Sequence, residues 1–177
     1  MTIANIYPAQ AIDRNDLHQL EIKCYDYPLN KDDWASILKI GEGAFDSFRA
    51  EVFKRNGMIL GYFVYMEPSL PMDDGQLDDL LLFRVGVQPS LRKQGIGSML
   101  LDRVRDLCQQ RELGEFQIRV PEYFLDKEEN RGLSDFYRTN GLEYYSTEKD
   151  SYYHYGRYFD GITYRSGGKR EPLPCGS

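Results

Sequence analysis

The chain has 177 residues, a length that suits one domain with a single hydrophobic core, and 41% of its residues are hydrophobic. Its formal net charge of −6 argues against generic binding to nucleic acid or to an anionic membrane, because both attract basic surfaces. No window approaches the roughly 20 apolar residues of a membrane span, and the sequence lacks a basic and apolar leader. We therefore expect a cytoplasmic protein with no nucleic-acid or membrane partner.

The cysteines and histidines argue against two further classes of protein. Cys24, Cys108 and Cys175 are far apart and form no Cys-x-x-Cys pair, which favours reduced thiols over a disulfide framework. Only His18 and His154 are present, and they do not stand at metal-ligand spacing. We expect no metal site.

The first third of the chain predicts two helices and a hairpin. Apolar residues recur at helical spacing over 17–24, and Asn30 can cap a second helix. Two strand-like runs within 47–66 flank Asn56-Gly57, a dipeptide typical of a tight β-hairpin turn.

The middle of the chain predicts a strand, a helix and a second strand. Residues 80–87 form a continuous apolar run, which is typical of a strand buried inside a sheet. An apolar stripe at helical spacing follows Gly97, with Gly114 placed as the C-terminal cap. Residues 116–120 predict the next strand, and the short joints favour two parallel strands with a right-handed crossover.

The last third predicts one more helix and a terminal pair of strands. Residues 130–140 have a helical pattern closed by Gly141, and the tyrosine-rich stretch 142–165 alternates like an antiparallel pair. The last dozen residues have no apolar pattern. We therefore expect one domain over residues 1–165 and a flexible tail over 166–177.

The turn before the central helix has the chemistry of an anion-binding site. A helix that begins there leaves its first amide hydrogens unpaired and carries partial positive charge at that end. Gly95 and Gly97 let a diphosphate approach these amides, and Arg92 and Lys93 add positive charge. A dinucleotide fingerprint needs a glycine where Leu100 stands, and a P-loop needs Gly-Lys-Ser/Thr, so neither motif fits.

The remaining pattern, Arg-x-x-Gly-x-Gly directly after a buried strand, resembles the pyrophosphate loop of the GNAT superfamily of N-acetyltransferases. The Val-x-Val-x-Pro strand ending, the amphipathic helix, the next strand and the later Phe-Tyr-Arg-Thr-Asn-Gly-Leu segment follow in the family's order, from about residue 11 to 164. The resemblance implies an α/β fold with a single mixed, V-split β-sheet flanked by helices. It also implies acetyl-CoA (coenzyme A) as the cofactor.

The resemblance further implies which residues bind the coenzyme. The backbone of the strand ending at Val87 would bind the pantetheine arm, and a bulge at Gly86 would turn an amide toward the thioester carbonyl. A close packing contact is an equally open explanation for a glycine there. The amides of Gly86 and Val87 would stabilise the oxyanion. The coenzyme-binding residues expected from the family are Val85, Gly86, Val87, Arg92, Lys93, Gln94, Gly95, Ile96, Gly97, Ser98, Asn130 and Tyr137.

The resemblance also assigns a general acid. Tyr137 follows Asn130 by seven residues, as in the family, and would protonate the departing thiolate. A phenol with a pKa of about 10 can protonate a thiolate whose conjugate acid has a pKa of about 8.5. A packing role on the helix's apolar face is the alternative.

The general base departs from the family pattern. Arg119 stands at the position where the family has its base, and a guanidinium stays protonated at neutral pH. Glu122, at the start of an insertion over 121–129, is the nearest replacement. A terminal α-amine with a pKa near 8 needs only a water relay.

Within the superfamily, the chain most resembles protein N-terminal acetyltransferases of the ribosomal-protein alanine type. Glu-Ile-Lys-Cys-Tyr-Asp-Tyr-Pro-Leu over 21–29 and the late tyrosine pair carry this resemblance. It implies that the acceptor slot is lined by Tyr25, Tyr27, Pro28, Tyr152 and Tyr153.

The expected reaction is direct attack of a bound primary amine on acetyl-CoA in a ternary complex, preferably by a protein N-terminal α-amine. A small-molecule amine or amino acid is the alternative acceptor if the insertion and the acidic pairs at 73–74 and 78–79 close the slot. A third possibility is a module that binds acetyl-CoA with little turnover, which Arg119 favours.

Overall fold

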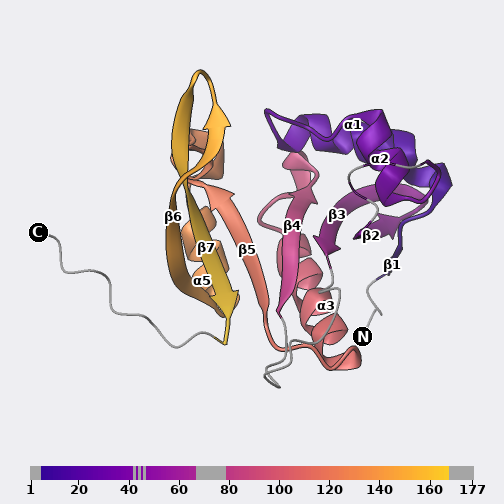
Figure 1. The fold of residues 1–177 in the computed structure, drawn as a ribbon. Helices are drawn as coiled ribbons and strands as arrows, with labels where there is room; N and C mark the ends of the chain where they lie inside the picture. Colours follow the sequence, from indigo (N-terminus) through magenta and orange to yellow (C-terminus); the bar gives the residue numbers. More distant parts are fainter. Residues whose placement is uncertain (1–4, 42, 44, 46, 67–78, 168–177) are drawn as a thin grey trace, which may run out of the picture.

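The computed structural model describes residues 5–41, 43, 45, 47–66 and 79–167. In that part of the chain, seven strands form one mixed sheet in the order β1-β2-β3-β4-β5-β7-β6 (Figure 1). The strands are β1 Ile6–Pro8, β2 Phe48–Arg55, β3 Met58–Met66, β4 Leu80–Val87, β5 Phe116–Pro121, β6 Leu142–His154 and β7 Arg157–Ser166. The α-helices are α1 Arg14–Cys24, α2 Lys31–Ile37, α3 Ile96–Gln110, α4 Glu122–Leu125 and α5 Leu133–Thr139, with 3-10 turns η1 Ala11–Asp13, η2 Pro89–Leu91 and η3 Glu128–Asn130.

Local signals in the sequence set several of these boundaries. The Asn30 side chain accepts hydrogen bonds from the amides of Asp32 and Asp33 at 2.8 and 2.9 Å, which caps α2 as predicted. Asn56 and Gly57 both adopt positive φ, 52° and 78°, so the predicted tight turn joins β2 to β3. The predicted terminal pair is the β6–β7 hairpin.

Alternate residues of β3 hold the two layers of helices on opposite faces of the sheet. Phe63 and Tyr65 are buried in the core that contains α3 and α5. Tyr62 and Val64 are buried in the other core, with α1 and α2. The period of two in a strand directs successive side chains to opposite faces, so one strand connects both cores.

The sheet divides between β4 and β5, which confirms the V-split. The two strands are parallel, and only Leu80–Leu82 pair with Phe116–Ile118. Beyond these residues β4 and β5 no longer pair, although β5 stays paired with β7 along its other edge, and the two strands diverge at their carboxyl ends (Figure 1). The amino end of α3 lies just beyond β4, beside this opening.

Two helix boundaries differ from those predicted. Helix α3 ends at Gln110 rather than at Gly114, because Glu112 adopts the left-handed φ of 52° that ends the helix. Helix α5 begins at Leu133 rather than at residue 130, because Gly132 before it is left-handed, with φ 84°. Asn130 therefore lies in η3.

Other differences lie outside the predicted elements. The insertion contains helix α4, and β1 was not predicted. Ser166, expected in the tail, is the last residue of β7, whereas residues 168–177 lie outside the described part of the chain. The acidic residues at 73, 74 and 78 also lie outside it. None of the helices in the described residues is long and apolar enough to cross a membrane.

Candidate active site

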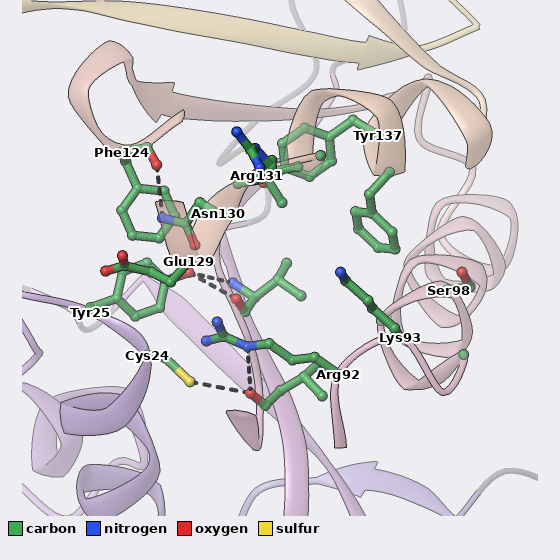
Figure 2. Close-up of a pocket in the computed structure, with 17 residues that line it drawn as sticks. Cys24, Tyr25, Arg92, Lys93, Ser98, Phe124, Glu129, Asn130, Arg131 and Tyr137 are labelled. Carbon is green, nitrogen blue, oxygen red and sulfur yellow. Dashed lines mark hydrogen bonds between the residues drawn. The ribbon is translucent and has the colours of Figure 1, made fainter. Parts of the chain in front are cut away.

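The divergence of β4 and β5 leaves a pocket with a cavity volume of about 490 Å³ (Figure 2). Its walls come from the end of α1, the carboxyl half of β4, the amino end of α3, and the segment from α4 to α5. Most of the expected coenzyme-binding residues line it, namely Val85, Val87, Arg92, Lys93, Gly95, Gly97, Ser98, Asn130 and Tyr137. Gly86, Gln94 and Ile96 do not.

The amino end of α3 forms an open cradle for an anion. Gly95 precedes the helix in the left-handed conformation, with φ 84°, and no side chain caps the helix amides. A Cβ at Gly95 would meet nothing within 4 Å, so the space beside these amides is open. Arg92 and Lys93 line the same end of the pocket, and Arg131 lines the opposite wall. This combination fits a diphosphate.

The β4 edge that faces the pocket carries main-chain groups that β3 does not use. The amide of Gln88 donates to the Leu60 carbonyl at 2.9 Å, and in an antiparallel ladder every second residue is bonded in this way. Gly86 is therefore bonded to β3, whereas Val85 and Val87 direct their main-chain groups toward the split.

Gly86 is required for packing, not for a bulge. A Cβ there would overlap the ring of Tyr62, and the residue pairs regularly with Tyr62. The register shift between Val64 and Tyr65 instead leaves Phe83 as the extra residue of β4. The expected bulge at Gly86 is thus wrong, because Gly86 and Tyr62 are in regular register. The close contact with Tyr62 explains the glycine instead. The Gly86 amide, bonded to β3, is also not available to an oxyanion.

Side chains of the same chain bond the main-chain groups of this edge (Figure 2). The Tyr25 hydroxyl donates to the Val85 carbonyl at 2.9 Å and accepts from the Val85 amide at 3.2 Å. The Val87 carbonyl lies 3.6 Å from Cys24 Sγ and accepts from Arg92 Nε at 3.4 Å. Burial is the main cause that raises the pKa of Tyr25, so its phenol stays protonated.

Tyr137 lies on α5 with only 4% of its surface exposed, yet it lines the pocket. Its ring packs against Tyr164 with centroids 4.9 Å apart, and its hydroxyl has no hydrogen-bond partner among the described residues. Burial raises its pKa well above the ordinary value, and the neighbouring Tyr25 and Tyr164 add to this shift. The Tyr137 phenol therefore keeps its proton at neutral pH, and the ring is part of the core.

The two candidate positions for a base lie outside the pocket. Arg119 Nη1 pairs with Glu148 at 2.5 Å, with about half of each side chain exposed. Glu122 is exposed at the start of α4 and is not part of the pocket lining. The structure therefore does not bring Glu122 together with Tyr137.

The expected acceptor residues separate into three places. Tyr25 lies in the pocket. Tyr27 stacks on His154 at 3.9 Å between centroids, and the Tyr152 hydroxyl donates to the Arg119 carbonyl at 3.4 Å. Tyr153 is 61% exposed and packs against Tyr158, because alternation along β6 turns it away from the face that carries Tyr152. Pro28, beside Tyr27, is half-buried.

Helix α4 supplies contacts that the sequence did not reveal. Phe124 stacks on Tyr25, with centroids 5.4 Å apart and planes 10° apart. The adjacent Tyr123 packs against Phe159 at 4.8 Å and His154 at 5.3 Å, at the hairpin. The side-chain amide of Asn130 donates to the Phe124 carbonyl at 2.8 Å and holds α4 against η3. The aromatic pair in the insertion was the signal that could have suggested this.

Further pocket residues were also missed, namely Cys24, Phe124, Glu129, Arg131, Gly132, Leu133 and Phe136. Apart from Cys24, they come from α4, α5 and the segment that joins them, whose path over the split depends on tertiary packing. No group of three or more potential metal ligands occurs among the residues that the structure describes.

A mixed sheet that splits beside a glycine-rich helix start defines the class of acyl-coenzyme A N-acyltransferases. The sequence matches the model of the Acetyltransferase (GNAT) family over residues 14–142, and the chain belongs to that family. It is an N-acetyltransferase with acetyl-CoA as co-substrate. No curated protein matches the sequence significantly.

Solved structures share the fold at low sequence identity. The ribosomal-protein-S18-alanine N-acetyltransferase of Escherichia coli superimposes with a TM-score of 0.70 at 18% identity, covering 97% of this chain and 99% of that one. Arabidopsis thaliana Naa50, in complex with the bisubstrate analogue CoA-Ac-MVNAL, gives 0.66 at 20% identity, covering 93% and 99%. Arabidopsis thaliana NAA60 in complex with acetyl-CoA gives 0.68 at 14% identity, covering 90% and 96%.

Proposed function

We propose that the chain transfers an acetyl group from acetyl-CoA to a protein N-terminal α-amine. The observation that carries this proposal is the position of Tyr137, whose buried phenol lines the same cavity as the amino end of α3 and the β4 edge. An anion cradle, main-chain groups and a proton donor in one cavity are suited to transfer from a coenzyme thioester.

The chain's own residues would orient the coenzyme. The α3 amides, with Arg92 and Lys93 beside them, would hold the diphosphate, and Arg131 adds positive charge from the opposite wall. The main-chain groups of Val85 and Val87 would align the pantetheine arm along β4. When bound, acetyl-CoA supplies the reactive thioester.

Proton transfer would need one group from the protein. The Tyr137 phenol, protonated because its pKa is raised, would give its proton to the thiolate that departs. An α-amine with a pKa near 8 is already partly neutral at physiological pH, so it can attack without a protein base. The Val87 amide, which faces the split, would stabilise the oxyanion.

The acceptor class is supported by the neighbouring structures. The Escherichia coli neighbour is named for acetylating an alanine of a ribosomal protein, and the analogue in Naa50 joins coenzyme A to a peptide. In this chain the acceptor would enter between the segment after α1 and the β6–β7 hairpin, where Tyr27 stacks on His154. We call this region the acceptor side.

Intact-mass analysis of peptides incubated with the protein and acetyl-CoA tests this proposal. Peptides with a free N-terminus should gain one acetyl group. Matched peptides with a blocked N-terminus and an internal lysine should not, because a lysine amine with a pKa of about 10.4 is almost fully protonated at neutral pH. Acetylation of the blocked peptides at an equal rate would contradict the α-amine assignment.

Two contacts favour a small amine as the second candidate acceptor. The stack of Tyr27 on His154 and the bond from the Tyr155 amide to the Tyr27 hydroxyl, at 3.4 Å, join the two walls of the acceptor side. A slot bridged in this way suits a small acceptor better than a chain. Thiol release with small amines, but with no free-N-terminus peptide, would support this candidate.

A further inference from the structure

At the edge of β4 that faces the pocket, a side chain of the protein itself occupies main-chain groups that a bound coenzyme would need. The Tyr25 hydroxyl satisfies both main-chain groups of Val85, donating at 2.9 Å and accepting at 3.2 Å. These are groups that β3 leaves unpaired and that an extended ligand arm along β4 would need. Tyr25 and such an arm cannot both use them fully.

The position of Tyr25 is fixed by its ring as well as by its hydroxyl. The ring stacks on Phe124, and the Arg84 guanidinium lies over it at 4.5 Å from the centroid. Arg84 Nε is held in turn by the buried carboxylate of Glu21 at 3.2 Å. These contacts hold the ring where its hydroxyl reaches Val85, so the bond is formed before any coenzyme binds.

The same segment is anchored to the acceptor side. The Tyr155 hydroxyl donates to Asp26 Oδ2 at 2.8 Å, and Lys127 also pairs with this carboxylate. Tyr27 stacks on His154 at the tip of the hairpin. Residues 24–27 thus connect the β4 edge to the β6–β7 hairpin.

We propose that Tyr25 is a displaceable occupant of the pantetheine site, and that its displacement by the coenzyme loosens the contact of residues 24–27 with the hairpin. Coenzyme binding at β4 is thereby coupled to the contact between residues 24–27 and the hairpin. The inference rests on the coenzyme site of the proposed function, but not on the identity of the acceptor.

A rival arrangement predicts the opposite change in coenzyme affinity when the Tyr25 hydroxyl is removed. If Tyr25 stayed in place and hydrogen-bonded to the coenzyme, removing its hydroxyl would weaken coenzyme binding. If Tyr25 competes, the Tyr25→Phe variant keeps the ring stack, leaves Val85 open to the ligand and binds more tightly. The expected gain is about three- to tenfold, the range for one or two neutral hydrogen bonds.

Calorimetry with coenzyme A alone measures this directly. The wild type, Tyr25→Phe and a matched control, Tyr144→Phe, are titrated, with thermal melting to verify folding. Tyr144 also loses one hydroxyl, bonded to Thr147 at 2.9 Å, but on β6 away from the pocket. We expect tighter binding by Tyr25→Phe and unchanged binding by the control. Equal or weaker binding by Tyr25→Phe overturns the inference.

Hydrogen exchange of the wild type provides a second measurement that needs no variant. The amide of Tyr155, which donates to the Tyr27 hydroxyl, should exchange faster when coenzyme A is bound. Slower or unchanged exchange overturns the coupling. Tighter binding by Tyr25→Phe without peptide acetylation would leave this inference intact and refute only the proposed acceptor. No binding of coenzyme A by the wild type would refute both.

Discussion

Gly97 on α3 lies so close to Phe136 on α5 that a Cβ at Gly97 would fall 2.9 Å from Phe136 Cζ. Phe136 precedes Tyr137, so this contact lies between the amino end of α3 and the residue proposed as the proton donor. Real Cβ atoms essentially never approach a carbon this closely, so a side chain at Gly97 requires the Phe136 ring, or α5 with it, to shift.

Gly97→Ala should lower kcat about tenfold or more by displacing Tyr137, and destabilise the fold by about 1–3 kcal/mol through overpacking. Steady-state kinetics and denaturant unfolding measure the two effects. Gly41→Ala is the matched control, because its added Cβ would meet nothing closer than Ala35 Cβ at 3.9 Å. Equal behaviour of the two variants would show that the α3–α5 contact does not position the site.

Comparing Gly95→Asp with Gly95→Asn should separate the effect of a negative charge on coenzyme binding from the effect of any side chain at this position. Asn and Asp both tolerate the left-handed φ of 84°, but only Asp places a carboxylate beside the α3 amides. We expect coenzyme A to bind Gly95→Asp at least about tenfold more weakly than Gly95→Asn, with a gap that narrows in high salt. Calorimetry at two ionic strengths measures this. Equal affinities would mean that no anion binds there.

Tyr137→Phe should leave stability and coenzyme affinity nearly unchanged, because the ring contacts remain and the hydroxyl has no partner among the described residues. The loss of a proton donor should lower kcat by about 10²- to 10⁴-fold. Since its pKa is raised well above 10, the wild type should lose no activity through Tyr137 up to pH 10. Kinetics over pH 6–10 and thermal melting check this, and an unchanged kcat would leave Tyr137 only a packing role.

Glu122→Gln should change kcat/KM less than about threefold, because the carboxylate is exposed and does not line the pocket. The rate with a free-N-terminus peptide should rise with pH to a plateau near 8, the pKa of the α-amine itself. A pH–rate profile of both proteins measures this. A large loss with a displaced acid limb would restore Glu122 as the base.

The parts of the fold that depend on residues close together in the sequence could be predicted. The Asn30 cap, the Asn56-Gly57 turn and the buried strand β4 each follow from a few consecutive residues. The ends of α3 and α5 could not, because left-handed residues at Glu112 and Gly132 end and begin the helices against the apolar pattern.

The candidate site was predictable where a motif specifies the backbone. The loop pattern led to Arg92, Lys93, Gly95, Gly97 and Ser98, which line the pocket, and to Gln94 and Ile96, which do not. The bulge was misplaced because it depends on the register between β3 and β4, which brings Tyr62 against Gly86. The hydrogen bond from Tyr25 to Val85 joins residues 60 positions apart in the sequence, and no local pattern predicts such a contact.

Helix α4 places two adjacent aromatic rings on different halves of the molecule's opening, Phe124 against Tyr25 and Tyr123 against His154. A single short insertion therefore contacts both the pocket proposed for the coenzyme and the hairpin proposed to flank the acceptor. In divergence from a common ancestor, a change in its length would alter the selectivity for both substrates in one step.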